Sequence, residues 1–455
     1  MTRAGSSDTI AAVSTAPGRA AIAVVRVSGP SAGSIAGALG LGALEARHAT
    51  LRHVKHPVGG EGLDRALVSW YPAPASYTGE DMLELSSHGG AIVPATLLDA
   101  VCAGGARPAE PGEFTRRAYL NGKLDLLQVE ATLDLIDANS PRLRRAALFS
   151  LERGLSERVE ELRAGVLELQ ALIAYDIDFP EEDDGPVDRE RIRGSADRLL
   201  SSLDRMLRLA PEGELLREGA LTVIAGRPNA GKSSIFNALL GVERTIVTEV
   251  PGTTRDAVEA LVSVDGYPFR LVDTAGIHES EERIEGMGIE VARSYLGQAD
   301  LVLLCVDASE EDTVSESASL GSLPELPGED RVIQLQTKAD MVSGCVRPET
   351  GRSVLVSVRT GEGLEQLRSE MLKCVYEGLQ GAGEVPLVTR ARHTRSLQSA
   401  RQALDGFLRA WSSDKPPEIA ATYLQDAVVA LEEMLGVVTT DDILDTLFAS
   451  FCVGK

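Results

Sequence analysis

Short apolar runs separated by turn residues characterise roughly the first 120 residues of this 455-residue chain. Runs at 21–27, 63–70 and 82–85 have the length of β-strands, and residues 91–104 read as a helix that ends at a pair of glycines. Clusters of Pro and Gly separate these segments. The pattern predicts an α+β domain at the N-terminus.

From about residue 122 the spacing of apolar residues becomes helical. Leucines and valines between Leu148 and Leu169 lie three or four positions apart, which predicts one long amphipathic helix ending near Pro180. Helical spacing resumes over 188–209. It returns after residue 387, where one predicted face carries Ile419, Tyr423, Val428, Leu431 and Leu435.

Between these helical stretches, residues 218–380 alternate strand-like and helix-like segments, as an α/β nucleotide-binding domain does. Two helical stretches that flank such a block indicate one helical domain with a second domain inserted into it. We therefore predict a multidomain chain with an α+β N-terminal domain (1–121), a discontinuous α-helical domain (122–216 and 381–455) and an inserted α/β Ras-like P-loop G domain (217–380).

The composition limits the environment and the partners. The formal charge of −23 opposes binding of nucleic acid by the bulk surface, because phosphate contacts come from Lys and Arg. RNA would need a local basic patch or a second protein to hold it. No apolar run approaches the ~20 residues that span a bilayer, and no secretory signal is evident. The five cysteines are scattered without a C-x-x-C pair, which predicts reduced thiols in a cytoplasm rather than disulfides or a zinc site.

The strongest chemical signal is a phosphate loop over residues 226–234, which reads G-R-P-N-A-G-K-S-S. A strand-like run precedes it and a helix-like run follows, which is the context that G-x-x-x-x-G-K-[ST] requires. Backbone N–H groups of the loop and the helix N-terminus can surround phosphate oxygens. Lys232 can reach the β- and γ-phosphates of a nucleoside triphosphate, and Ser233 can ligate Mg²⁺.

Further segments of a GTP site follow in order. Thr254 can supply a second Mg²⁺ ligand, and Asp273 can hold Mg²⁺ through water while the N–H of Gly276 binds the γ-phosphate. Asp340 can accept hydrogen bonds from guanine N1–H and N2–H, a donor pair that adenine lacks. The predicted nucleotide contacts are Asn229, Ala230, Gly231, Lys232, Ser233, Ser234, Thr254, Asp273, Thr274, Ala275, Gly276, Thr337, Lys338, Asp340, Ser357, Val358 and Arg359.

Two positions depart from a Ras-like site. Thr337 stands where the base-recognition motif usually has Asn, so we expect guanine selectivity with somewhat weaker base binding. Ile277 stands where Ras-like GTPases have the Gln that orients water, and no arginine finger is identifiable. Another group must therefore orient water, and a glutamate between His278 and Glu290 is a candidate.

Over essentially its full length the chain resembles the MnmE/TrmE family of bacterial tRNA-modification GTPases. The segments that carry the resemblance are residues 17–19, 77–85, 88–90, 107–115, 120–126 and the terminal F-C-V-G-K at 451–455. The resemblance implies an N-terminal domain that binds folate and forms a homodimer, and G domains that dimerise when GTP is bound. It also implies a heterotetramer with a flavoprotein of the MnmG/GidA type.

The resemblance further implies the reaction. The two proteins would add an aminomethyl or carboxymethylaminomethyl group to C5 of the wobble uridine (U34) of certain tRNAs. The one-carbon unit would come from a 5-formyl- or methylene-tetrahydrofolate, and GTP hydrolysis would gate the cycle.

Particular residues carry the family's roles onto this sequence. Potassium would replace the arginine finger, held by Asn229, Thr248, Thr253 and the carbonyl of Val250, and Thr248 and Thr253 would also contact the nucleotide. Glu285 would orient the attacking water. The implied folate contacts are Arg26, Glu84, Lys123 and Lys455. Cys452 is either an inert core thiol or a group that acts as a nucleophile or positions the one-carbon unit.

Three alternatives stay open at this point. A ribosome-assembly GTPase of the Era or Der type shares the G-domain motifs but carries a KH-type RNA-binding module, and the sequence shows no GXXG-centred basic module. The N-terminal domain could act as a folate enzyme by itself. The chain could also be a regulatory GTPase without chemistry of its own.

Overall fold

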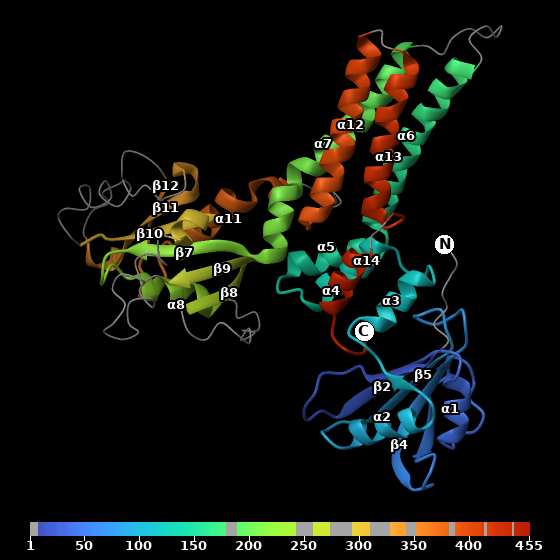
Figure 1. Ribbon diagram of the computed structural model, residues 1–455. Helices are drawn as coiled ribbons and strands as arrows, with labels where there is room; N and C mark the ends of the chain where they lie inside the picture. The colour runs from blue at the N-terminus through green and yellow to red at the C-terminus, as the bar shows by residue number, and fades with distance from the viewer. Residues whose placement is uncertain are drawn as a thin grey trace. The chain divides into compact units, whose positions relative to one another are not determined.

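The computed structural model describes residues 8–178, 189–242, 258–273, 294–309, 328–342, 352–381, 387–413, 416–438 and 441–455. The chain forms two compact units, one made of Met1–Leu133 with Glu432–Lys455 and the other of Asp134–Leu431 (Figure 1). Within the described residues, no helix has both the length and the apolar character needed to cross a bilayer.

The first unit is built on a six-stranded sheet with the order β3-β4-β5-β2-β1-β6. Neighbouring strands are antiparallel except β1 and β6, which are parallel. The strands are β1 (Ile10–Val13), β2 (Ile22–Ser28), β3 (Thr50–Lys55), β4 (Gly62–Tyr71), β5 (Met82–His88) and β6 (Arg107–Pro108). The strands and the helix predicted from the sequence here are all present, with ends that differ by a few residues.

One face of this sheet is covered by helices α1 (Ala32–Ala38) and α2 (Val93–Ala103). Val25, Val27, Leu83 and Leu85 pack with them in a buried cluster. Because side chains alternate along a strand, the residues between these positions lie on the opposite face.

The C-terminal segment belongs to the same unit. Helices α3 (Glu113–Leu120), α4 (Leu126–Ile136) and α14 (Asp441–Ala449) lie near one another, and a buried cluster here includes Val129 of α4, Phe448 of α14 and Phe451 just after it. The last residues then reach the sheet domain, where Val453 forms an isolated antiparallel bridge with Pro111. Gly112 has a φ of 67°, and a Cβ there would lie 2.7 Å from the carbonyl oxygen of Phe448. Only glycine fits such a close approach without strain.

In the second unit, helices precede and follow an α/β domain along the chain. They are α5 (Pro141–Leu151), α6 (Gly154–Asp178), α7 (Arg189–Glu218), α12 (Ala391–Ser412) and α13 (Pro417–Leu435). Figure 1 shows α6, α7, α12 and α13 running side by side. The fold is multidomain, as predicted, with an α+β N-terminal domain, a helical domain in two chain segments and a P-loop G domain between those segments.

Two predicted helical features were wrong in detail. The single helix predicted through Leu148 and Leu169 is two helices, α5 and α6, because Arg153 takes a φ of 72° between them. The three- and four-residue spacing continues through this break, so periodicity could not reveal it. On α13 the buried stripe runs through Ala420, Leu424 and Leu431, whereas Ile419 is exposed.

The G domain has a second six-stranded sheet with the order β12-β11-β10-β7-β9-β8, parallel except for β8. Its strands are β7 (Ala220–Gly226), β8 (Val258–Val264), β9 (Tyr267–Asp273), β10 (Leu301–Asp307), β11 (Val332–Thr337) and β12 (Arg352–Leu355). Its described helices include α8 (Lys232–Val242) and α11 (Leu364–Gly381), with 3-10 turns η1 (Glu329–Arg331) and η2 (Ala339–Met341). Carboxyl ends of parallel strands meet at one edge, where such sheets bind ligands.

Candidate nucleotide and cofactor sites

The phosphate loop connects β7 to α8 at this carboxyl edge. Gly226 and Asn229 have positive φ values of 144° and 65°, a backbone conformation typical of loops whose N–H groups bind anions. Lys232 is buried, and its Nζ donates hydrogen bonds to the carbonyl oxygens of Gly226 at 2.9 Å and Arg227 at 2.7 Å. The ammonium group therefore lies across the loop that would hold the phosphates.

Two predicted Mg²⁺-site residues from different motifs meet beside the loop. Ser233 Oγ, at the start of α8, donates a hydrogen bond to Asp273 Oδ2, at the end of β9, over 2.9 Å. A hydroxyl and a carboxylate are the oxygen ligands that Mg²⁺ prefers. The pair fits a nucleotide-bound Mg²⁺, with Ser233 as ligand and Asp273 as the group behind it.

The base-recognition segment, residues 337–340, is held in place by hydrogen bonds of Thr337 and Asp340. Thr337 is buried, and its hydroxyl lies 2.8 Å from the carbonyl oxygen of Ala230 in the phosphate loop and 3.2 Å from that of Val306. Asp340 Oδ1 accepts a hydrogen bond from Ser357 Oγ at 2.7 Å, and this bond lowers the pKa of Asp340. The ionised carboxylate is the form that accepts from guanine.

The other predicted nucleotide residues lie at the same edge of the sheet or outside the residues that the structure describes. Arg359 is exposed, and its Nε lies 3.3 Å from Asp340 Oδ2. Gly231 is close to Thr337, and Ser234 and Val358 are exposed. Outside the described residues lie Thr248, Val250, Thr253, Thr254, Thr274, Ala275, Gly276 and Glu285.

Asp307 was missed by the sequence interpretation. It ends β10, a strand that is otherwise entirely apolar, and its side chain faces Lys338 of the base-recognition segment. Burial alone would raise the pKa of Asp307, but hydrogen bonds from Lys338 and Ser309 outweigh it and keep the pKa low. An aspartate at the carboxyl end of a buried strand is the signal that could have identified it.

A second candidate site lies on the face of the N-terminal sheet opposite α1 and α2. Arg26 on β2 and Glu84 on β5 are register partners, and Arg26 Nε and Nη2 both lie 2.9 Å from Glu84 Oε1. The guanidinium also lies over the rings of Tyr77 and Phe114, at 5.6 Å and 5.7 Å from their centroids. These contacts hold a cation and a carboxylate in one fixed arrangement.

The C-terminal tail contacts Arg26 of this ion pair. Arg26 Nη1 donates a long hydrogen bond of 3.4 Å to the carbonyl oxygen of Gly454. Burial lowers the pKa of the neighbouring Lys455, and the charge of Arg26 lowers it further. Three of the four predicted folate residues, Arg26, Glu84 and Lys455, are thus brought together although 429 positions separate the first from the last.

Lys123 and Cys452 are placed differently. Lys123 is exposed, and its Nζ donates to the carbonyl oxygen of Pro74 at 3.2 Å. Among the hydrogen bonds and ion pairs of the described residues, none joins Lys123 to Arg26, Glu84 or Lys455. Cys452 is an exposed free thiol, so its predicted alternative as a buried core residue was wrong.

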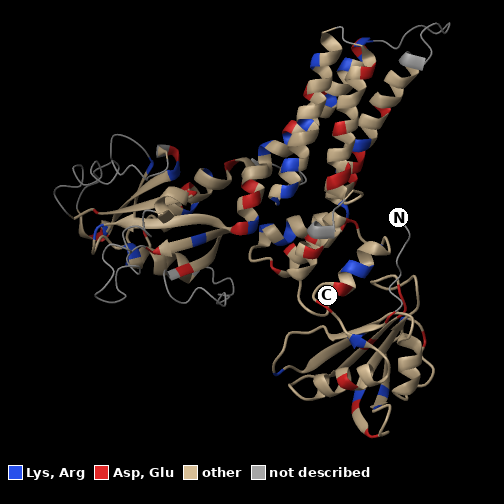
Figure 2. Cartoon of the chain, viewed as in Figure 1, with Lys and Arg blue, Asp and Glu red and all other residues tan. Residues whose placement is uncertain are grey.

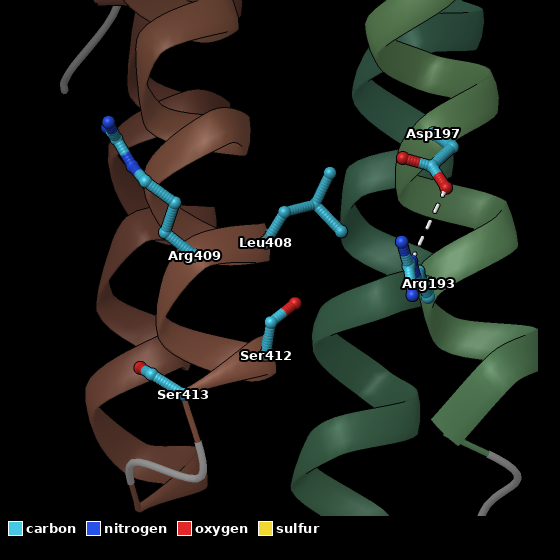
Figure 3. A pocket seen from close by; sticks show the side chains of 6 residues that line it. All are labelled: Arg193, Asp197, Leu408, Arg409, Ser412 and Ser413. Atoms are coloured by element: carbon cyan, nitrogen blue, oxygen red, sulfur yellow. Dashed lines mark ion pairs between the residues drawn. The ribbon is translucent and has the colours of Figure 1, made fainter.

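A cavity of about 330 Å³ opens between α7 and α12. Figure 3 shows Leu408 and Ser412 facing Arg193 and Asp197, which form a loose ion pair of 3.9 Å. The residues that line it include none of those predicted to bind nucleotide, metal or folate. Its charged groups have partners on their own helices, so we assign no site to it.

The comparisons with known proteins agree with this arrangement. The chain matches the family described as MnmE helical domain over residues 126–452 and the family described as GTP-binding protein TrmE N-terminus over residues 9–123. It is 41% identical to the tRNA modification GTPase MnmE of Pseudomonas aeruginosa (strain UCBPP-PA14) over 458 aligned residues, covering 99% of each chain.

Two further relatives give the same result. The tRNA modification GTPase MnmE of Neisseria meningitidis serogroup C (strain 053442) is 40% identical, over 98% of this chain and 99% of that one. The protein of the same name from Heliobacterium modesticaldum (strain ATCC 51547 / Ice1) is 41% identical over the same shares. A ribosome-assembly GTPase would not match both terminal domains in this way. The chain belongs to the MnmE/TrmE family of tRNA modification GTPases.

Proposed function

We propose that this protein is a K⁺-dependent GTPase that works with an MnmG/GidA-type flavoprotein. Together they would add an aminomethyl or carboxymethylaminomethyl group to C5 of the wobble uridine (U34) of certain tRNAs. The observation that carries the proposal is the match over 99% of the chain to a relative named tRNA modification GTPase. The gathering of Lys232, Ser233, Asp273 and Asp340 at one sheet edge supports GTP as the nucleotide.

The pair Arg26–Glu84 fits a reduced folate. Both bonds from Arg26 end on Glu84 Oε1, so Oε2 can accept from the amino-pyrimidine of a pterin, which is an array of donors. Lys123, an exposed cation, can pair with the carboxylates of the glutamate tail, at the other end of the folate from the pterin. When bound, a 5-formyl- or methylene-tetrahydrofolate would supply the one-carbon unit. Because Lys123 donates to the carbonyl oxygen of Pro74, it would contact a bound folate from that side of the site.

Asn229 supports the K⁺ part of the proposal. Its backbone is in the left-handed region inside the phosphate loop, and its amide oxygen is a hard ligand suited to a hard cation. Thr248, Thr253 and the carbonyl of Val250 would complete the K⁺ site, and Glu285 would orient the attacking water. We expect Glu285→Ala to bind GTP but to lose most hydrolysis in K⁺ buffer. Unchanged turnover would refute that role.

Exposed apolar residues on the sheet face opposite α1 and α2 support a homodimer through the N-terminal domain. Leu51 and Leu67 are register partners on β3 and β4, both are exposed, and Ile22 on β2 is exposed too. Exposed apolar side chains on one face are typical of an interaction surface. We also propose that the G domains of two copies meet when GTP is bound.

The charge distribution supports a partner that holds the tRNA. Figure 2 shows acidic and basic residues interspersed along α6, α7, α12 and α13. Arginines here pair with carboxylates, as Arg401 does with Asp204 and Arg409 with Asp405. Such a surface attracts phosphates weakly, so we expect the flavoprotein to supply most tRNA contacts within a heterotetramer. Because its proposed substrate is tRNA, we expect this protein in the cytoplasm.

The thiol of Cys452 is proposed to act at the folate site. The exposed thiol of Cys452 stands two residues before Gly454, whose carbonyl contacts Arg26, so it can reach a one-carbon unit held there. If Cys452→Ser leaves tRNA modification intact, the thiol has no chemical role.

We propose domain limits of 1–121 for the N-terminal domain, 122–216 with 381–455 for the helical domain, and 217–380 for the G domain.

Reconstitution tests the function directly. Purified protein, an MnmG/GidA-type flavoprotein, unmodified tRNA, GTP and methylene-tetrahydrofolate are combined in K⁺ buffer, and wobble uridine is analysed by mass spectrometry. We expect modified U34 only when both proteins and GTP are present. Modification without the flavoprotein would favour a folate enzyme that acts alone. No modification in the complete mixture, with GTP still hydrolysed, would favour a regulatory GTPase.

A further inference from the structure

The carboxylate of Asp307, at the end of β10, pairs with Lys338 in the base-recognition segment. None of the roles predicted from the sequence includes Asp307. Asp307 is nearly buried, with 9% of its side chain exposed. Its Oδ1 accepts from Ser309 N at 2.9 Å and from Ser309 Oγ at 2.6 Å. Its Oδ2 accepts from Lys338 Nζ at 2.5 Å. Both oxygens are therefore engaged, and the carboxylate has one orientation.

Lys338 is the residue that turns the chain toward the guanine site. It has a φ of 56°, in the left-handed region that residues other than glycine rarely adopt. This turn separates the end of β11 from η2, and η2 carries Asp340. A strained conformation persists only where its surroundings hold it, and the ion pair with Asp307 holds the side chain of this residue.

Thr337 makes this support more important in this chain. Its hydroxyl carries one proton, which must be shared between the carbonyl oxygens of Ala230 and Val306. An asparagine amide has two protons and could donate to two acceptors. The segment therefore has one donor fewer at residue 337, and the Asp307–Lys338 pair supplies a second attachment to the end of β10.

We propose that Asp307 is a positioning residue for guanine recognition, acting through Lys338 to keep Asp340 in place. Asp307 does not touch the base. It restrains the backbone of the segment so that the Asp340 carboxylate, already held by Ser357, presents its oxygens to guanine N1–H and N2–H. The effect concerns selectivity for the base rather than binding of the phosphates, which rests on Lys232 and the loop.

The ratio of GDP to IDP affinity tests this role. Hypoxanthine lacks the 2-amino group, so the ratio measures the hydrogen bond from N2–H to Asp340 and is insensitive to phosphate contacts. Dissociation constants are measured on the full chain by competition with a fluorescent nucleotide. We expect Asp307→Ala to reduce the preference for GDP by about ten-fold, the size of a lost hydrogen bond to a charged group. An unchanged ratio would overturn the proposal, whether or not both nucleotides bind less tightly.

Four further variants make the result decisive. Asp307→Asn keeps the size of the side chain and decides the matter if Asp307→Ala does not fold, as judged by circular dichroism. Lys338→Met should reduce the ratio to the same extent, and the double variant should add nothing; additive effects would contradict action through Lys338. Glu370→Ala removes the carboxylate of a different lysine–carboxylate pair, with Lys373 on α11, and should leave the ratio unchanged. A fall there would show that the ratio responds to any lost charge pair.

Discussion

The Tyr376 hydroxyl lies 2.8 Å from the carbonyl oxygen of Pro268 and donates to it across the base of the G domain. The same hydroxyl lies 3.1 Å from the carbonyl oxygen of Leu215, near the end of α7. Tyr376 is fully buried at a kink in α11, and its ring contacts those of Tyr267 and Phe269. One phenol therefore joins α11, β9 and the last helix before the G domain.

Removing this hydroxyl should destabilise the second unit. Tyr376→Phe removes the one phenolic proton that the carbonyl groups of Pro268 and Leu215 share, and we expect the free energy of unfolding to fall by about 1–3 kcal/mol. The chain has two tryptophans, so a Trp70→Phe background leaves Trp411 on α12 as the only tryptophan reporter of urea unfolding. Tyr423→Phe on α13 is the matched control. Equal stability of Tyr376→Phe and its parent would show that the hydroxyl does not stabilise the unit.

The K⁺ role of Asn229 can be separated from its backbone role. Asn229 has a φ of 65°, which glycine adopts freely and alanine does not. We expect Asn229→Gly to keep the loop but to lose the stimulation of GTP hydrolysis by K⁺ over Na⁺, because the amide oxygen is gone. Asn229→Ala should lose it as well and also bind GTP more weakly. K⁺ stimulation that survives in Asn229→Gly would exclude the amide as a ligand.

The proposed folate site predicts a specific loss in Glu84→Gln. The substitution keeps the size of the side chain but removes the charge that pairs with Arg26. We expect 5-formyl-tetrahydrofolate to bind about ten-fold more weakly or worse, measured by calorimetry on the full chain. Glu61→Gln, on an exposed turn, is the control. The site assignment fails if both variants bind the folate as tightly as the unaltered protein.

An ion cluster in the first unit predicts sensitivity to acid. Hydrogen bonds from Arg107 lower the pKa of Asp8. Burial would raise the pKa of Glu113, but hydrogen bonds from Arg107 and the buried Arg117 outweigh it, so this pKa is lowered as well. A depressed pKa in the folded state means that the stabilisation is complete above the unfolded pKa and is lost as the pH falls through the folded one.

We therefore expect the first unit to lose stability below about pH 4. Glu113→Gln should lower its stability at pH 7 by about 1–3 kcal/mol and should flatten the acid dependence. Unfolding is followed through Trp70 on β4 in a Trp411→Phe background. Arg116→Gln on the same helix breaks only the exposed pair with Asp445 and serves as control. An acid profile in Glu113→Gln as steep as in the parent would contradict the linkage.

Much of the fold was predictable because its signals are local. The apolar runs of β2, β4 and β5 and the spacing along α2 lie within a few residues of the observed elements. The break at Arg153 was not predictable, because the apolar spacing on both sides of it is continuous. Exposure of Ile419 likewise depends on which neighbour covers α13, and the pattern on one helix does not contain that information.

Residue types at short, definite spacings were enough to identify the phosphate loop, the base-recognition aspartate Asp340 and the family. Which distant residues meet depends on the three-dimensional packing of the chain. Ser233 meets Asp273, 40 positions away, Thr337 meets Ala230, 107 away, and Arg26 meets Gly454, 428 away. Sheet order and the path of the C-terminal tail set these pairs, and both depend on packing between segments that no local pattern encodes.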